Sequence, residues 1–149
     1  MLRIPEAVRP RILIAEDDPM VMELITTRLE LAGFQTYSAR DGGEALSRIS
    51  DLRPDGLVLD INMPILDGFQ VLSRLKSTGA IQRTPTLVLT ARNRPEDVRK
   101  AIELGARDFI SKPFQDEQLI ARVGRLVRRA RPPVFIQAPE TCKQHIIET

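Results

Sequence analysis

The chain has 149 residues and a formal net charge of +2, the small difference between 22 basic and 20 acidic residues. Its length is that of one ordinary domain, and 42% apolar against 28% charged residues excludes an intrinsically disordered chain. The nearly balanced charge argues against a globally basic nucleic-acid-binding protein, and neither a membrane-spanning run nor the apolar segment of a secretory signal is present.

Five short, mostly apolar runs alternate with segments of helical period along the chain. They are predicted strands and cover residues 11–15, 34–38, 56–60, 86–90 and 108–112. Three of the runs are continuously apolar, which is typical of strands that are covered on both faces.

The first predicted helix follows the first strand. Asp18 is its predicted N-cap, Pro19 takes the first helical position, and Gly33 supplies the C-terminal stop. Apolar residues at helical spacing form its predicted buried stripe, namely Val21, Leu24, Ile25, Leu29 and Ala32.

The second predicted helix opens at Asp41, which with Glu44 has the spacing of a capping box. The fourth begins at Pro95 and ends at Gly105. The third and fifth predicted helices are recognised by buried faces, made of Val71, Leu72 and Leu75 in one and of Leu119, Val123, Leu126 and Ala130 in the other.

Strand–helix alternation repeated five times predicts an α/β fold with one parallel five-stranded sheet and helices on both sides. The right-handed crossover rule and the short connections favour the doubly wound strand order 2-1-3-4-5. The pattern stops at Pro132-Pro133, so we expect a single domain over residues 11–131 and a linker or tail over 132–149. The single cysteine, Cys142, fits a cytoplasmic protein without disulfides.

Polar side chains follow four of the five predicted strands. Glu16 and Asp17 end the first, Asp60 the third, Thr90 the fourth and Lys112 the fifth. Each alone is an ordinary helix cap, but the carboxyl ends of parallel strands meet at one edge of a sheet, where ligands bind. We therefore expect these side chains to share one site.

Three carboxylates in one site repel one another unless a cation lies among them. Mg²⁺ is suited to this task because it binds carboxylate and phosphate oxygens, whereas the lack of nearby Cys or His disfavours zinc. A metal, the ammonium of Lys112 and the hydroxyl of Thr90 around the carboxylate of Asp60 are the parts needed for phosphoryl transfer to that carboxylate.

Four motifs in this order resemble the receiver domains of two-component response regulators, the CheY-like domains. They are ILIAEDDP at 12–19, LVLDINMPILDG at 57–68, LVLTA at 87–91 and FISKPF at 109–114. The resemblance covers about residues 11–131. It implies a CheY-like fold and a signalling switch of a two-component system or phosphorelay, phosphorylated by a histidine kinase or a histidine phosphotransfer protein.

The resemblance also implies roles for individual residues. Asp60 is the expected phospho-acceptor, Asp17 and Asp60 the direct Mg²⁺ ligands, Glu16 a ligand through water, and the backbone carbonyl of Asn62 the remaining protein ligand.

Thr90 and Lys112 are expected to contact the phosphoryl group, and the bond between Lys112 and Pro113 to be cis. Phe109 takes the position of the switch aromatic, so phosphorylation is expected to move Thr90 and Phe109 and to change the face of the fourth helix, fifth strand and fifth helix. Arg92, two positions after Thr90, is expected to tune how long the phosphoryl group lasts.

The fifth helix is rich in arginine, with Arg122, Arg125, Arg128 and Arg129, followed by Arg131. A solvated basic face is one interpretation. The other is a homodimer or effector contact that uses Asp108 and Glu103 as acidic partners, whereas direct nucleic-acid contact needs a broader basic surface.

Two other functions use related chemistry or topology. A phosphatase of the haloacid-dehalogenase type needs a second carboxylate two residues after the nucleophile, where this chain has Asn62. A flavodoxin-type protein needs a phosphate-binding loop after the first strand, where the acids Glu16, Asp17 and Asp18 repel phosphate. The Cys142–His145 pair is half a metal site and is interpreted as chance.

Overall fold

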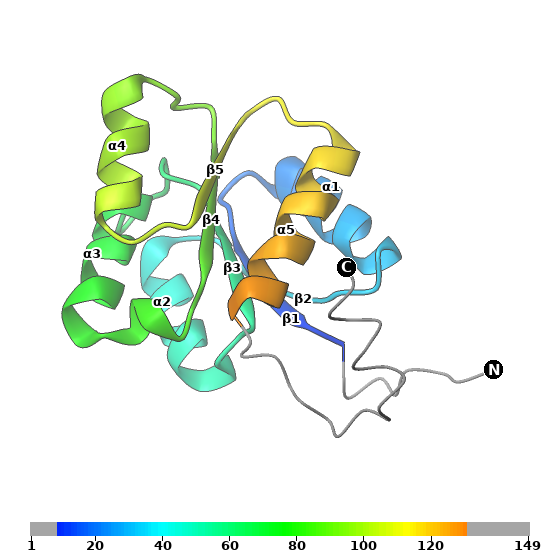
Figure 1. Cartoon of the computed structure of the whole chain (residues 1–149), viewed down its shortest axis with the longest axis horizontal. Coiled ribbons are helices and arrows are strands. Elements are labelled where there is room, and N and C mark those ends of the chain that lie inside the picture. The colour runs from blue at the N-terminus through cyan, green and yellow to red at the C-terminus, as the bar shows by residue number, and fades with distance from the viewer. Residues whose placement is uncertain (1–8, 131–149) are drawn as a thin grey trace, which may run out of the picture.

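A parallel five-stranded sheet forms the centre of the molecule (Figure 1). The computed structural model describes residues 9–130 of the chain. The strand order is β2-β1-β3-β4-β5, and every neighbouring pair is parallel, which confirms the predicted topology. The strands are β1 (Arg11–Ala15), β2 (Gln35–Ala39), β3 (Gly56–Leu59), β4 (Thr86–Thr90) and β5 (Asp108–Ser111).

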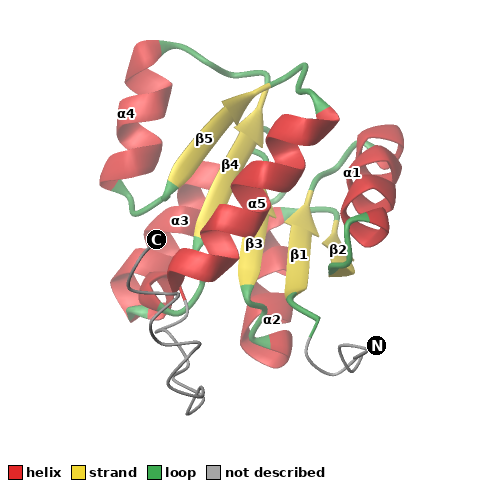
Figure 2. Cartoon of the chain, turned by 45° about the vertical axis from the view of Figure 1, so that its right-hand side comes forward, coloured by secondary structure: helices red, strands yellow, loops and turns green. Residues whose placement is uncertain are grey.

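Helices cover both faces of this sheet, so the domain has three layers (Figures 1 and 2). α1 and α5 lie on one face, and α2, α3 and α4 on the other. None of the helices within the described residues is long and apolar enough to cross a membrane. The helices are α1 (Pro19–Leu31), α2 (Gly42–Leu52), α3 (Gly68–Thr78), α4 (Pro95–Glu103) and α5 (Asp116–Ala130), with the short 3₁₀ helix η2 (Ala80–Gln82) after α3.

The side chains of the central strands divide between two hydrophobic cores. In β1, Leu13 points into the core under α2 and α3, while Ile12 and Ile14 point into the core under α1 and α5. All three side chains have no exposed surface. Because alternate residues of a strand face opposite sides of the sheet, a strand covered twice needs apolar residues at every position. This burial fixes where each strand ends, and therefore where the polar residues that follow it lie.

Most helix boundaries agree with the sequence analysis. Asp18 caps α1 by accepting from the backbone N–H of Met20 at 2.9 Å, and Gly33 has the positive φ of 100° expected of a helix stop. Leu24 and Ala32 were expected in the buried stripe, but Leu24 is 40% exposed and Ala32 is exposed as well, because the contact with the sheet is centred on Ile25 and Leu29. The side chain of Ala130, predicted to be buried, lies outside the part of the structure that is described.

The capping box is found on a different helix from the one predicted. Asp41 does cap α2, accepting from Glu44 N–H at 2.7 Å, but the Glu44 carboxylate lies 3.8 Å from Arg48 and no return bond is present among the described contacts. The complete reciprocal box joins Asp67 and Gln70 at the start of α3. Glu44 has a competing cation one turn away, which the spacing alone did not reveal.

Candidate functional site

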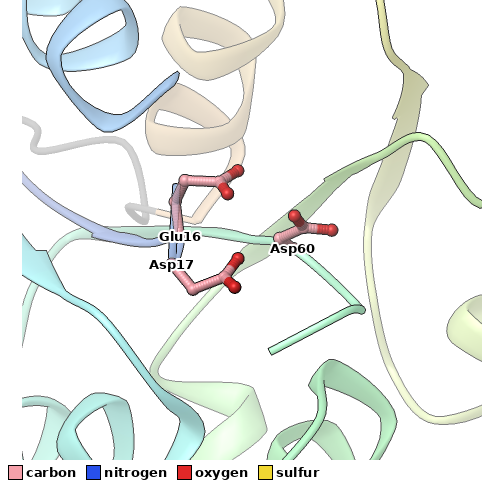
Figure 3. Close-up of side chains that lie close together, drawn as sticks. All are labelled: Glu16, Asp17 and Asp60. Carbon is pink, nitrogen blue, oxygen red and sulfur yellow. The ribbon is translucent and has the colours of Figure 1, made fainter. Parts of the chain in front are cut away.

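Three carboxylates converge at the carboxyl ends of β1 and β3. Glu16 and Asp17 follow β1, Asp60 follows β3, and one oxygen of each lies within 4.8 Å of the others (Figure 3). Glu16 is 2% exposed and Asp60 6% exposed, whereas Asp17 is exposed. The predicted convergence of acids from two strand ends is therefore present in the structure.

The sheet itself fixes the backbone of two of these acids. Glu16 N–H donates to the carbonyl of Ala39 at 2.9 Å, and Asp60 N–H donates to the carbonyl of Ala15 at 3.0 Å. Both bonds continue the ladder one residue past the strand. The carboxylates are thus held by rigid backbone, which keeps their mutual repulsion from being relieved by a movement of the chain.

Lys112 reaches into the acidic cluster from the end of β5. Its Nζ lies 2.6 Å from Oε1 of Glu16 and 2.9 Å from Oδ2 of Asp60, and its backbone N–H donates to the carbonyl of Thr90 at 2.9 Å. Three carboxylates against one ammonium leave the pocket a net charge of −2 when all are ionised. Asp17 is the acid to which Lys112 makes no ion pair among the described contacts.

The pocket shifts the pKa of Glu16 upward. Burial is the main cause, and the nearby charge of Asp60 adds to it, while the hydrogen bond from Lys112 opposes the shift. Burial by itself lowers the pKa of Lys112, but its contacts with Glu16 and Asp60 outweigh burial and raise that pKa. Lys112 therefore stays an ammonium ion, and the pocket still carries excess negative charge that favours a further cation.

Thr90 ends β4 beside this pocket and is fully buried. Its Oγ1 accepts a hydrogen bond from the backbone N–H of Arg92 at 3.2 Å. Phe109 pairs in register with Val88, so Phe109 and Thr90 lie on the same face of the sheet, and Phe109 is half-buried against the core there. The predicted proximity of these two residues is confirmed.

The loop after Asp60 is tightly constrained. Asn62 is exposed, and its backbone N–H donates to Oδ1 of Asp60 at 3.3 Å. Gly68 N–H donates to the carbonyl of Ile61 at 2.7 Å, which closes the loop onto the start of α3. Ile65 adopts a φ of 71°, which is rare for a β-branched residue, and the Leu66 N–H bonds to the carbonyl of Pro64 at 2.8 Å across it.

The arginine-rich helix α5 uses one of its arginines within the chain. Nη1 of Arg122 lies 2.6 Å from Oδ1 of Asp108, the acid that was considered as a partner for a dimer contact. Arg125 and Arg128 are exposed. The side chain of Arg129 and the residues Arg131, Cys142 and His145 lie outside the described residues.

Two residues near the site were not singled out from the sequence. Asp97, in the first turn of α4, is 5% exposed and accepts from Nε of Arg92 at 2.9 Å. The guanidinium carbon of Arg92 also lies 5.3 Å from the ring centroid of Phe69, at the start of α3. Aspartate is rarely buried unless it is paired, and no pattern in the sequence marked Asp97 as buried.

Comparisons with known proteins agree with this geometry. The family model described as a response regulator receiver domain matches residues 12–124. Response regulator MprA of Mycobacterium avium is 44% identical over 122 residues, covering 82% of this chain and 53% of that protein. The transcriptional regulatory protein PrrA of Mycobacterium leprae is 42% identical over 120 residues, covering 80% of this chain and 51% of that protein.

Solved structures show the same architecture. The receiver domain of the Francisella response regulator 1452 superposes with a TM-score of 0.78 at 35% identity and covers 83% of this chain and all of that domain (100%). The receiver domain of DrrB activated with BeF3 superposes with a TM-score of 0.72 at 27% identity, covering 81% of this chain and 99% of that one.

The fold and the acidic pocket define a phospho-acceptor domain of two-component signalling rather than a classical enzyme. The chain belongs to the response regulator receiver family, the CheY-like domains. This membership decides against the phosphatase and the flavodoxin-type alternatives. The chain spans about half the length of the curated relatives it matches.

Proposed function

We propose that Asp60 is the residue that accepts the phosphoryl group. The observation that carries this proposal is the position of its carboxylate, which ends the central strand β3 between Lys112 at 2.9 Å and the acids that follow β1. Asp60 is also the acid whose backbone is fixed on both sides, by the ladder before it and by the closed loop after it. A nucleophile held in this way reacts with little loss of orientational freedom.

The donor set of the pocket fits Mg²⁺. Oxygen ligands from carboxylates that lie within 4.8 Å of one another suit a hard divalent cation, and the net negative charge remains after Lys112 is counted. Asp17 and Asp60 would bind the ion directly, Glu16 through a water molecule, and the carbonyl of Asn62 would complete the protein ligands. When bound, the ion neutralises charge on the phosphoryl oxygens and on the acids around them.

In the transfer step, a carboxylate oxygen of Asp60 forms a bond to phosphorus. The bond between phosphorus and a nitrogen of the donor's phosphohistidine breaks, and that nitrogen keeps the electron pair. Lys112 moves from a carboxylate contact to a phosphoryl oxygen, and the Thr90 hydroxyl donates to another. The donor is a histidine kinase or a histidine phosphotransfer protein.

The switch that follows involves Thr90 and Phe109. As Thr90 turns toward the new phosphoryl oxygens, it leaves space on the face of the sheet that it shares with Phe109. Phe109 fills this space and shifts the populations of the α4–β5–α5 face, through which a homodimer could form. We take residues 11–131 as the receiver and 132–149 as the linker or tail that follows it.

The acceptor assignment is tested with acetyl phosphate and MgCl₂, followed by intact mass and peptide mapping. We expect one phosphoryl group on the unmodified chain, none when EDTA replaces MgCl₂ in the reaction, and none on Asp60→Asn. Glu23→Gln is a matched control, because Glu23 is an exposed acid on α1 outside the pocket. A phosphoryl group that persists on Asp60→Asn would place the acceptor elsewhere.

A further inference from the structure

The loop between β4 and α4 is held at Arg92 by three contacts with different partners. Its backbone N–H donates to Oγ1 of Thr90 at 3.2 Å, and its Nε donates to Oδ1 of Asp97 at 2.9 Å. Its guanidinium carbon lies 5.3 Å from the ring centroid of Phe69. One residue thus joins the hydroxyl beside the pocket to two side chains on α4 and α3.

The two side-chain partners of Arg92 are themselves fixed. Asp97 and Phe69 are each 5% exposed. A carboxylate with so little exposure needs its cationic partner, because an unpaired buried charge is strongly unfavourable. The ring of Phe69 adds a second attraction for the same guanidinium. The side chain of Arg92 is therefore anchored by helices and not by its own loop.

This anchor leads back to the acceptor loop. Phe69 follows Gly68, whose N–H donates to the carbonyl of Ile61, the residue after Asp60, at 2.7 Å. A Cβ added at Gly68 would lie 2.5 Å from the carbonyl oxygen of Asp60, so the start of α3 is packed directly against the acceptor backbone. Arg92 consequently relates Thr90 to Asp60 through a short series of fixed contacts.

The hydrogen bond at Thr90 decides what its hydroxyl can do. A threonine hydroxyl offers one hydrogen and two lone pairs. The N–H of Arg92 occupies a lone pair, and Thr90 Oγ1 donates to no other residue in the described part of the chain. The hydroxyl hydrogen is therefore available to an incoming acceptor, and phosphoryl oxygens are strong acceptors.

We propose that Arg92 is a positioning residue for phosphoryl acceptance. Its side chain, anchored on Asp97 and Phe69, holds its own backbone N–H on Thr90 Oγ1, so that the hydroxyl hydrogen points to the phosphoryl group. This inference rests on the proposed role of Asp60 as acceptor. It goes beyond that role because it assigns a task to Asp97 and Phe69, neither of which is a member of the acidic cluster.

A simpler interpretation is that Arg92 and Asp97 only stabilise the start of α4. Arg94, the N-cap of α4, makes no side-chain capping bond, so the contact between Arg92 and Asp97 would stabilise a helix start that lacks a cap. That interpretation predicts a loss of stability that is independent of Thr90. The two interpretations are separated by a double-mutant cycle with Thr90.

The cycle compares the rate of phosphorylation by acetyl phosphate at saturating Mg²⁺ in four proteins: the unmodified chain, Arg92→Ala, Thr90→Ala and the double variant. We expect Arg92→Ala to slow phosphorylation by about three- to tenfold, the worth of one well-placed hydrogen bond. In the Thr90→Ala background the same change should have almost no effect. Arg92→Lys, which keeps a cation near Phe69 without the guanidinium, should be intermediate.

Lys100→Ala provides the matched control. Lys100 Nζ lies 4.4 Å from the centroid of the same ring, and among the described contacts it makes no hydrogen bond or ion pair with Thr90 or the loop, so its loss should leave the rate unchanged. Equal slowing in both Thr90 backgrounds, or no slowing in Arg92→Ala, would overturn the inference. Should Arg92→Ala fail to fold, the cycle with Arg92→Lys carries the same test. Absence of phosphorylation in the unmodified chain would instead refute the proposed role of Asp60.

Discussion

Lys112 neutralises the charge of the acidic pocket unevenly. Its ammonium lies against Glu16 and Asp60, the two buried acids, while the exposed Asp17 receives no such ion pair among the described contacts. The uncompensated charge is therefore on the side of Asp17, facing solvent. A cation arriving from solvent meets this side first, where an oxygen of Asp17 and an oxygen of Asp60 lie within 4.8 Å of each other.

At the residue scale, removing the charge of Asp60 should stabilise the protein in the absence of metal. Burial is the main cause of the raised pKa of Glu16, and Asp60→Asn removes the repulsion that adds to it, while Lys112 keeps its ion pair with Glu16. We expect a gain of about 1 kcal/mol in unfolding free energy in EDTA, because fewer like charges remain in the pocket. The measurement is thermal unfolding in EDTA.

The same variant should respond less to magnesium. Binding to the folded state raises the midpoint of unfolding, and loss of a direct ligand weakens that binding. Titration of MgCl₂ should raise the midpoint of the unmodified chain and of Glu23→Gln far more than that of Asp60→Asn. Equal midpoints in EDTA together with equal responses to MgCl₂ would show that these carboxylates do not interact.

The meeting of Glu16, Asp17 and Asp60 could be predicted because parallel strands end at one edge of the sheet, and short apolar runs locate those ends well. The contacts of Arg92 could not be predicted. They depend on where a loop residue lies relative to α3 and α4, and the sequence spacing of Arg92, Asp97 and Phe69 does not determine how close these residues come. Arg122 and Asp108 were considered for a dimer contact, but their pairing within the chain depends on how α5 lies against β5, which the spacing does not give.

At the scale of elements, the loop from Asp60 to α3 is held by close packing of backbone. Gly68 leaves no room for a side chain, because an added Cβ would lie 2.7 Å from Cα of Ile61. Gly42, at the start of α2, is packed in the same way against the backbone of Leu66. The starts of two helices therefore pack closely against this loop, in which Ile65 has a positive φ of 71°.

Two glycine-to-alanine changes test this packing in opposite directions. Gly68→Ala forces the start of α3 away from β3, and we expect a loss of about 1–3 kcal/mol, the usual effect of overpacking. Gly124→Ala, on α5, meets only the flexible side chain of Arg128 at 3.2 Å, so it should stabilise by about 1 kcal/mol through helix propensity. Chemical denaturation measures both. A neutral Gly68→Ala would mean that the loop yields easily.

The helices themselves were predictable from local signals, and the exceptions have local causes. Asp18, Pro19 and Gly33 fixed the limits of α1 because capping depends on neighbouring residues only. The burial of Leu24 was not predicted correctly, because it depends on the angle at which α1 packs on the sheet. The return hydrogen bond of Glu44 was not predicted correctly, because Arg48 competes for the same carboxylate.

At the scale of the whole molecule, the raised pKa of Glu16 makes folding depend on pH. Between the ordinary glutamate value of 4.5 and the raised value, the folded protein binds a proton that the unfolded chain releases. Stability in EDTA should therefore fall as pH rises from 4.5 through the raised pKa, and Glu16→Gln should remove this part of the slope. Chemical denaturation at a series of pH values gives the unfolding free energy of the unmodified chain and of Glu16→Gln. If this free energy changed with pH in the same way in both proteins, the raised pKa of Glu16 would be contradicted.

The tight packing of Gly42 and Gly68 has a consequence for the direction in which a signal leaves the pocket. On the side of Asp60, the backbone of the loop packs directly against the backbone of α2 and α3. On the side of Thr90, the segment that leads to α4 is held by the hydrogen bonds of Arg92, which can exchange partners. We therefore expect a phosphoryl group on Asp60 to displace the residues from Thr90 to α4 more than the loop from Asp60 to α3.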